Sequence, residues 1–385
     1  MLKKVIHMPV PASNAITKIL AKRKAIESSL SFLSDKRQVL IYGAGNSGKE
    51  LLDLLLSKGV FVKGFLDGIV AEGAKVNGYE VYRPDTHELE QDQRNKYCVV
   101  ISIFNVSVDI KPIQENLLRC GYETIVTFLE LYRHFPSELG NRLWLTDPSF
   151  YNDCEPFLAD ALSLWEDESS RNIFKEVLDF RCSFDYAVLP QRTSEKQYFD
   201  TTIPKINASR YVDCGAYDGD TIQTLCRHAD TIEAVAAFEP DLNNFVALSN
   251  KVRKFKQIKQ ATLFPCGVWS KASQLSFLGA LGTSSNISAA GDTTICCVAL
   301  DEVLVGFKPT YIKMDIEGAE FSALLGAQQI IKTDRPALAI CLYHKPEHLW
   351  QIPLLIKSWN LEYTFYLRVY EYLGQELVMY AIPAT

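Results

Sequence analysis

An apolar run that leads directly into a glycine turn and then into a helical pattern occurs twice in this chain. The first example is "VLIYGAGNSG", residues 39–48, and the second is "SRYVDCGAYDGDT", residues 209–221. A buried strand that enters a helix through such a turn is typical of parallel sheets with helices packed on their faces. The sequence therefore predicts two α/β units, which suits a chain of 385 residues.

The composition is that of a globular protein without an anionic partner. The chain is 48% hydrophobic and 22% charged, with a net charge of −6. No basic run stands out, so we expect neither nucleic acid nor an anionic membrane surface as a partner. No stretch approaches the ~20 apolar residues of a membrane span. The basic N-terminus lacks the apolar core of a secretory signal and is expected to form a surface helix over residues 14–34.

The ten cysteines include no C-x-x-C pair, and most of them lie inside apolar runs. Cysteines in such surroundings are typically small buried residues rather than disulfide partners or zinc ligands. Free thiols are favoured in reducing compartments. We therefore expect a cytoplasmic protein.

The first unit, residues 35–135, has features of a nucleotide-binding fold. Its G-x-G-x-x-G turn is formed by Gly43, Gly45 and Gly48, with Asn46 inside the turn. Asp67 ends the next strand, about 20 residues later, where dinucleotide-binding folds place the acid that holds a ribose. The unit also resembles the Rossmann-like N-terminal domains of sugar-modifying enzymes.

Three uses of this first unit stay open. It could bind NAD, it could hold a nucleotide or nucleotide sugar, or it could serve only packing or dimerisation. The chain lacks the Tyr-x-x-x-Lys motif of sugar epimerases, so we do not expect NAD chemistry. We expect a nucleotide or nucleotide-sugar module that presents an acceptor or stabilises the assembly, and homo-oligomer formation is left open.

Residues 136–205 interrupt the alternation of strands and helices. Their pattern is mostly helical and predicts a connector that covers the site of the second unit. The second unit, residues 206–385, shows five alternating strands and then a closing pair, "YTFYLRVY" and "ELVMYAIP". This order predicts a mainly parallel sheet with one antiparallel strand inserted at the end.

The glycine turn of the second unit carries Asp213, Asp218 and Asp220. These carboxylates would repel the phosphates that such turns commonly hold. They suit S-adenosylmethionine, which has no phosphate and carries a sulfonium and an ammonium group. Glu239 ends the next strand, where a carboxylate can accept both hydroxyls of a ribose. Helix caps and solvated charges are the alternative for each acid taken singly, but their combination favours a methyl-donor site.

Further stretches make residues 195–385 similar to the FkbM-type S-adenosylmethionine-dependent methyltransferases. They are "YVDCGAYDGDT", "AAFEPD", "PCGVWS", "TSSNIS", "YIKMDIEGAE" and "LYHKPEHLWQIP", together with the closing pair of strands. The resemblance implies the seven-stranded methyltransferase sheet. It also implies methyl transfer to hydroxyl oxygens of sugars, glycans or macrolide-type natural products.

The resemblance also implies donor-binding residues. Glu239, followed by Pro240, would hold the ribose. The adenine would lie against Cys266, Gly267 and Val268, and the cysteine departs from the small residues that the family favours. The methionine end of the donor would be lined by the first turn: Asp213, Gly215, Ala216, Tyr217 and Asp218.

Methyl transfer to an alcohol usually requires a general base or a metal, because an alcohol is a weak nucleophile at neutral pH. Asp315 and Glu317 end the fourth strand, beside the expected donor methyl, and His344 ends the fifth. We predict these three as catalytic residues, with Asp315 and Glu317 as the ligands if a divalent metal is bound. A helix cap at Asp315 and a purely structural His344 are the alternatives.

The segment "HKPEH", residues 344–348, matches the H-x-x-E-H pattern of some metalloproteases. That chemistry needs both histidines on one helical face. Pro346 disfavours helical geometry at the residue before it, so His344 should end a strand and His348 should belong to the next helix. We interpret the match as chance.

Three functions compete. The leading one is an O-methyltransferase that acts on a carbohydrate or a glycosylated product. The second is a NAD-dependent sugar oxidoreductase or epimerase that uses the first unit, and the third is a non-catalytic nucleotide-sugar binding protein. Acceptor specificity is expected in the connector and in the loop of residues 279–292.

Overall fold

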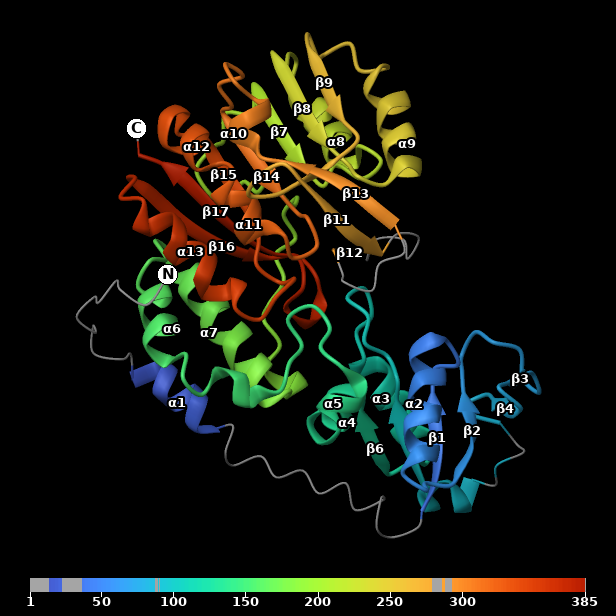
Figure 1. Ribbon diagram of the computed structural model, residues 1–385. Coiled ribbons are helices and arrows are strands. Elements are labelled where there is room, and N and C mark those ends of the chain that lie inside the picture. Colours follow the sequence, from blue (N-terminus) through green and yellow to red (C-terminus); the bar gives the residue numbers. More distant parts are fainter. Residues whose placement is uncertain are drawn as a thin grey trace.

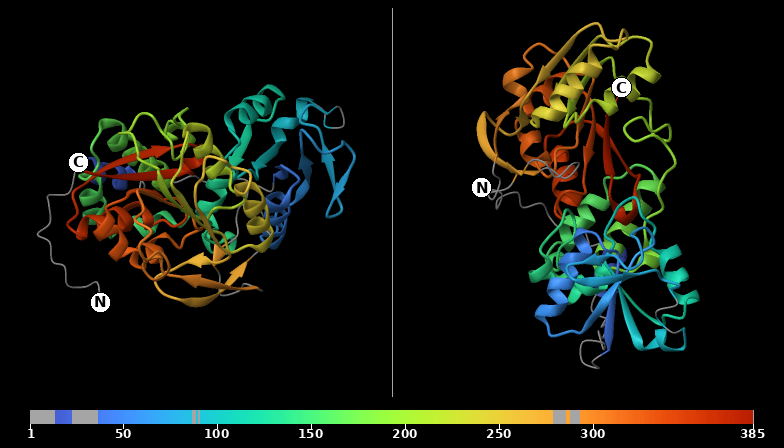
Figure 2. Two further views of the ribbon diagram at one scale, coloured as in Figure 1. Left: turned by 90° about the horizontal axis from the view of Figure 1, so that it is seen from above. Right: turned by 90° about the vertical axis from the view of Figure 1, so that its right-hand side faces the viewer.

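The computed structural model describes residues 14–22, 37–86, 89, 91–278, 286–287 and 293–384. Two sheets occupy separate lobes, the N-terminal lobe in blue and cyan and the C-terminal lobe in yellow to red (Figure 1, Figure 2). The specificity loop of residues 279–292 lies outside the described residues except for 286–287. No described helix is both long and apolar enough to cross a membrane.

The N-terminal lobe contains a six-stranded sheet among the described residues, parallel except at its β3 edge. Its order is β3 (Lys75–Val76), β4 (Tyr79–Tyr82), β2 (Val62–Leu66), β1 (Gln38–Tyr42), β5 (Tyr97–Ile101) and β6 (Thr124–Thr127). Val39 and Ile41 of β1 join one apolar core and Leu40 joins another. Alternate strand residues thus bury both faces of the sheet.

Helices cover this sheet and continue into the connector. Those of the lobe are α2 (Asn46–Ser57), α3 (Lys111–Arg119), α4 (Phe128–His134) and α5 (Pro136–Leu139). The connector contains the 3-10 turns Pro148–Tyr151 and Tyr186–Val188 and the helices α6 (Glu155–Leu162) and α7 (Glu168–Ser183). Both connector helices lie with the C-terminal lobe (Figure 1), where α7 packs on β16 and α6 on α13.

Of the predicted N-terminal helix, residues 14–34, the structure describes residues 14–22, and these are helical. Helix α1 (Asn14–Lys22) packs against α6 and α7. Ile16 is fully buried and Ile19 nearly so. The helix therefore closes the connector's core with one apolar face. Residues 23–34 of the predicted helix lie outside the described residues.

The C-terminal lobe has the predicted sheet. Among the described residues it has seven strands, in the order β16 (Tyr363–Val369), β17 (Leu377–Pro383), β15 (Ala337–Cys341), β14 (Tyr311–Met314), β7 (Arg210–Cys214), β8 (Ala234–Phe238) and β9 (Ala261–Phe264). Strand β17 is antiparallel to both of its neighbours, and the other pairs are parallel. This confirms the expectation of one antiparallel strand inserted into a parallel sheet.

The helices of this lobe follow the strands. They are α8 (Asp220–His228), α9 (Leu242–Val252), α10 (Leu300–Val303), α11 (Glu320–Leu325), α12 (Gln328–Asp334) and α13 (His348–Ser358). The run "TLFPCGVW", which the sequence suggested as one strand, is divided. Strand β9 ends at Phe264, before Pro265, whose ring removes the backbone donor that a continuous ladder needs.

The chain beyond Pro265 enters a smaller sheet that the sequence did not predict. In the described ranges its order is β10 (Gly267–Val268), β13 (Thr293–Val298), β11 (Ser273–Leu278) and β12 (Asn286–Ile287). Strands β11 and β13 stand beside the main sheet and reach away from it (Figure 1). Gly267 and Val268 lie where this small sheet meets the main one.

Candidate active site

A cavity of about 340 Å³ lies at the carboxyl ends of β7, β8 and β14. This is the edge at which open α/β sheets commonly bind ligands. Eight of the predicted site residues line it: Gly215, Tyr217, Glu239, Pro240, Gly267, Val268, Asp315 and Glu317. The structure thus brings the predicted donor and catalytic residues to one place.

The wall after β7 depends on Gly215. Its φ is +78°, and a Cβ at this position would lie 1.9 Å from the carbonyl oxygen of Asp315. Only glycine accommodates both the left-handed conformation and this approach. The turn after β7 and the end of β14 are therefore pressed together at the cavity.

Glu239 fixes the same turn from the neighbouring strand. Its Oε2 accepts a hydrogen bond from the Tyr217 N–H at 2.9 Å, and its Oε1 accepts one from the Asp241 N–H at 2.9 Å. Burial raises the pKa of Glu239, while these backbone donors oppose the shift. The carboxylate is thus held at the end of β8, on the cavity wall.

The three aspartates of the turn occupy different surroundings. Asp213 lies behind the wall, fully buried, with Oδ1 3.1 Å from Lys313 Nζ. Lys313 lines the cavity and also donates to the Gly215 carbonyl at 2.6 Å. Asp218 is half-buried and pairs with Lys251 at 2.8 Å. Of the three, only Asp220 lines the cavity.

Two further predicted donor contacts lie behind the lining. Ala216 and Cys266 are both buried, with 1% and 8% of their surface exposed, and neither lines the cavity. Their neighbours Tyr217 and Gly267 do line it. In both cases the backbone turn carries the predicted position into the core, and the next residue faces the cavity.

Asp315 and Glu317 lie at the far end of the cavity, and His344 lies behind them. His344 Nε2 is 3.4 Å from Asp315 Oδ1 and 3.5 Å from Glu317 Oε2. His344 Nδ1 is 2.7 Å from Glu320 Oε1, and Glu320 Oε2 is 3.3 Å from His348 Nδ1. The histidine therefore bridges a buried carboxylate and the two carboxylates of the wall.

The charges of this cluster follow from burial and proximity. Burial alone would lower the pKa of His344, but Glu320, Glu317 and Asp315 raise it to about 10. Burial raises the pKa of Glu317 to about 8, although His344 opposes the shift. Burial would also raise the pKa of Glu320, but His344 and His348 hold it well below its usual range. His344 is therefore protonated at neutral pH.

Protonated His344 gives folding a defined pH dependence. Its pKa rises from 6.5 to about 10 in the folded state, so its contribution is complete below pH 6.5 and is lost as the pH rises through about 10. The free energy of unfolding should fall across that window, by at most about 1.4 kcal/mol per pH unit for this one proton. Urea titrations of the wild type and His344→Gln at several pH values test this. Equal slopes for the two proteins would refute it.

Several cavity residues had no counterpart in the sequence-based prediction. Tyr198 donates to Asp315 Oδ2 at 2.9 Å. The Tyr343 hydroxyl lies 2.9 Å from Glu376 Oε1 and 3.3 Å from Asp315 Oδ1, so its one hydrogen is shared between these two carboxylates. Gln197 donates to Glu376 Oε2 at 2.6 Å. Two of them stood in quoted stretches: Tyr343 next to His344, and Glu376 at the start of "ELVMYAIP". The adjacency to His344 could have identified Tyr343.

Two groups of side chains among the described residues could hold a metal ion. Asp315, Glu320 and His344 bring one ligand atom each within 4.8 Å of one another, as do Asp315, Cys341 and Glu376. Both oxygens of Glu320 already face histidine nitrogens, and Glu317 belongs to neither group. A divalent metal held by Asp315 and Glu317 stays a prediction.

The glycine turn of the N-terminal lobe is tightly packed. A Cβ at Gly48 would lie 2.0 Å from the Gly43 carbonyl oxygen, whereas one at Gly45 would meet nothing within 4 Å. Asp67 Oδ2 accepts from the Ala44 N–H at 3.0 Å, and its Oδ1 accepts from Ile69 and Val70. The predicted ribose acid thus already holds its own loop, and ligand binding here stays a prediction.

The "HKPEH" segment has the geometry that excludes a shared helical face. His344 lies between β15 and α13, and His348 is the first residue of α13. Both side chains point to Glu320. The segment therefore completes the carboxylate cluster and does not form a protease motif.

Residues 213–375 match the family described as methyltransferase FkbM domain. The FkbM methyltransferase from Methylobacillus flagellatus KT has a similar structure, with 20% identity, 96% of this chain and 99% of that chain covered, and a TM-score of 0.76. At that identity the likeness shows the fold, and its coverage includes both lobes.

Two other solved structures are much less similar. The Rex-family repressor RSP has 22% identity over 28% of this chain and 63% of that chain, with a TM-score of 0.20. Aeropyrum pernix fibrillarin, solved with S-adenosyl-L-methionine, has 12% identity over 47% of this chain and 69% of that chain, with a TM-score of 0.29. These scores are too low to support an argument. A comparison with curated proteins found no match.

Residues 213–375 match the FkbM methyltransferase domain, and this match supports an S-adenosylmethionine-dependent methyltransferase. The seven-stranded sheet agrees with the fold of the similar FkbM methyltransferase. The sequence-based resemblance, placed at residues 195–385, is therefore confirmed for the larger part of its range.

Proposed function

We propose that this enzyme transfers the methyl group of S-adenosylmethionine to a hydroxyl of a sugar, a glycan or a glycosylated natural product. The observation that carries the proposal is the position of Asp315. Its carboxylate lies on the wall of the cavity, beside the glycine turn, where it accepts a hydrogen bond from the Tyr198 hydroxyl at 2.9 Å and lies 3.3 Å from the Tyr343 hydroxyl. A fixed oxygen acceptor at the reacting end of a donor site is what removal of a hydroxyl proton requires.

The donor is proposed to lie along the wall from Asp315 to Val268. Glu239 would accept the ribose hydroxyls, and Gly267 and Val268 would contact the adenine. The Gly215 turn allows close approach of the methionine end. Asp220 also lines this cavity, and its carboxylate would attract the positive sulfonium and ammonium groups.

The reaction needs alignment and one proton transfer. The donor supplies a methyl group bonded to a positively charged sulfur. As the acceptor oxygen bonds to that carbon, the carbon–sulfur bond breaks and its electron pair stays on sulfur. Asp315 takes the hydroxyl proton in the same step. Asp315 suits this role better than His344, because His344 is protonated and lies behind the cavity lining.

Protonated His344 would support the reaction from its position behind the cavity lining. Its positive charge lies 3.4 Å from Asp315 and 3.5 Å from Glu317, which holds both carboxylates in place beside the donor. Glu317 would complete the catalytic group through its raised pKa of about 8, as a hydrogen-bond donor to the acceptor near neutral pH. These roles are part of the proposal.

A carbohydrate acceptor fits the polar end of the cavity. Gln197, Lys196 and Glu376 line it beside Tyr343, and such side chains can donate to and accept from several hydroxyls at once. All ten cysteines lie in the described ranges and are free thiols. Free thiols support the proposal that the enzyme acts in the cytoplasm.

Donor binding tests the first half of this proposal. Glu239→Ala should weaken S-adenosylmethionine binding by about 10- to 100-fold, the value of one or two hydrogen bonds to a charged group. Calorimetric titration of the wild type and the variant measures the change. Glu233→Ala is the control, because Glu233 pairs only with Lys259 on the surface of the same lobe. Binding of NAD, with no binding of S-adenosylmethionine, would overturn the proposal.

The acceptor half requires a transfer assay. Sugars, oligosaccharides and glycosides are incubated with the donor, and the products are analysed by mass spectrometry for one added methyl group on oxygen. Methylation of nitrogen or carbon would contradict the hydroxyl acceptor while leaving the methyltransferase class intact.

A further inference from the structure

One wall of the cavity is formed by an irregular segment, residues 195–202, which we call the strap. It carries Tyr198, whose φ of +66° is in the left-handed region that favours glycine. Tyr198 is almost fully buried, with 5% of its surface exposed. Strained residues of this kind persist only where their surroundings fix them, and they cluster at functional sites.

Three tyrosines hold the strained residue. The Tyr198 N–H donates to the Tyr380 hydroxyl at 2.9 Å. The Tyr311 hydroxyl donates to the Tyr198 carbonyl at 2.8 Å. Tyr380 and Tyr370 share a hydrogen bond of 2.6 Å between their hydroxyls. Each polar backbone group of Tyr198 is therefore fixed by a side chain of the main sheet or its edge.

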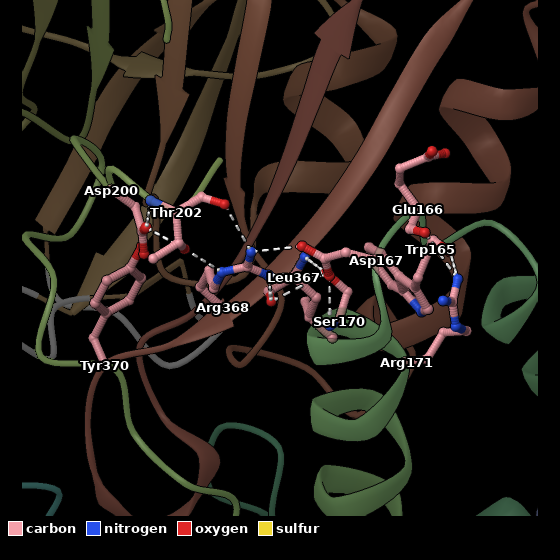
Figure 3. A network of polar contacts seen from close by, with 10 residues as sticks. All are labelled: Trp165, Glu166, Asp167, Ser170, Arg171, Asp200, Thr202, Leu367, Arg368 and Tyr370. Atoms are coloured by element: carbon pink, nitrogen blue, oxygen red, sulfur yellow. Dashed lines mark hydrogen bonds and ion pairs between the residues drawn. The ribbon is translucent and has the colours of Figure 1, made fainter. Parts of the chain in front are cut away.

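The rest of the strap is tied down by a buried network (Figure 3). Tyr370 donates to Asp200 Oδ2 at 2.9 Å. Arg368 of β16 donates to Thr202 Oγ1 at 2.9 Å and to Asp167 Oδ2 at 2.7 Å. Asp167 is the N-cap of α7. The strap is thus connected to both the sheet and the connector helix.

These contacts fix the position of the Tyr198 hydroxyl. The Tyr198 ring lies 5.3 Å from Lys313 Nζ, and its hydroxyl donates to Asp315 Oδ2 at 2.9 Å. We infer that Tyr198 is a positioning residue for methyl transfer, held by the strap so that its hydroxyl orients the Asp315 carboxylate toward the acceptor. This inference rests on the proposed role of Asp315.

The test removes only the hydroxyl. Tyr198→Phe should lower kcat by about 10- to 100-fold, the range for one hydrogen bond to a carboxylate, and leave the Kd for S-adenosylmethionine unchanged within about threefold. Tyr186→Phe is the control, because Tyr186 is a buried tyrosine whose hydroxyl has no hydrogen-bond partner among the described residues. A kcat for Tyr198→Phe within about twofold of this control would overturn the inference.

A double-mutant cycle shows whether Tyr198 acts through Asp315. In the Asp315→Asn background, Tyr198→Phe should cost about threefold or less, because the group that it positions is gone. If the fold loss in kcat of the double variant equals the product of the two single losses, Tyr198 acts independently of Asp315. That result would overturn the inference.

A separate readout distinguishes this inference from the proposed function. If the wild type methylates no hydroxyl acceptor, the proposed function fails, and the contact is then measured by urea unfolding of the same four proteins. A coupling of about threefold or more in the unfolding equilibrium constant would show that the strap holds the hydroxyl on Asp315. A smaller coupling would overturn the inference without reference to activity.

Discussion

Asp315→Asn should lower kcat for methyl transfer by about 100- to 10,000-fold, the usual contribution of a positioned general base. The amide keeps the shape of the side chain but cannot take the proton of the acceptor hydroxyl. Donor affinity should change little, because Glu239 and the Gly215 turn make the other proposed donor contacts. Single-turnover transfer of a labelled methyl group measures the chemical step directly.

The control for this prediction is Glu233→Gln, which neutralises an exposed carboxylate paired with Lys259. It should leave kcat unchanged. If Asp315→Asn also keeps kcat within about threefold, Asp315 is not the base. Glu317→Gln would then be the next variant to measure, since Glu317 also lines the cavity.

The sequence predicted the C-terminal sheet well because several of its strands are buried on both faces. Strands β8 and β15 are buried at every position, and such runs read as strands without knowledge of their neighbours. Only a short turn separates the two closing strands in the sequence. This spacing predicted that they pair antiparallel and that one of them is inserted into the parallel sheet. The small sheet was missed because β10 and β12 are two-residue strands, and because β12 lies within the segment 279–292, which was interpreted as a loop.

Site residues at the ends of strands could also be predicted. Glu239 and Asp315 each follow a buried run directly, and the carboxyl ends of parallel strands meet at one edge. Tyr198 comes from a segment without periodicity, and Glu376 comes directly before β17, at the start of a strand and not at the end of one. Their place at the cavity is set by tertiary packing, as in the bond from Gln197 to Glu376, and no local pattern encodes it.

The protonation state of His344 could not be predicted from the sequence, because it also depends on tertiary packing. A histidine at a strand end can be a base or a structural group, and the choice depends on what faces each ring nitrogen. Here a buried Glu320 lies 2.7 Å from Nδ1. The proton is thus held by the first residue of α11, and no sequence pattern indicates that its side chain points inward.

Gly215→Ala should destabilise the enzyme by more than about 4 kcal/mol, a loss that is exceptional for a single substitution. The left-handed conformation alone costs an alanine about 1–2 kcal/mol. The added methyl would also lie 1.9 Å from the Asp315 carbonyl oxygen, so β7 and β14 would have to separate at the cavity. Urea unfolding gives the loss of stability, and calorimetry should show that donor binding is lost with it.

Gly306→Ala is the control that separates the cost of the left-handed conformation from the cost of the close contact. Gly306 lies in the same lobe with a φ of +75°, close to the +78° of Gly215, and a Cβ there would meet nothing within 4 Å. This control should lose only the conformational part, about 1–2 kcal/mol, and should bind the donor normally. If the two variants lose equal stability, the close approach of the turn to β14 costs nothing. The contact that places Asp315 against the donor turn would then be looser than the structure shows.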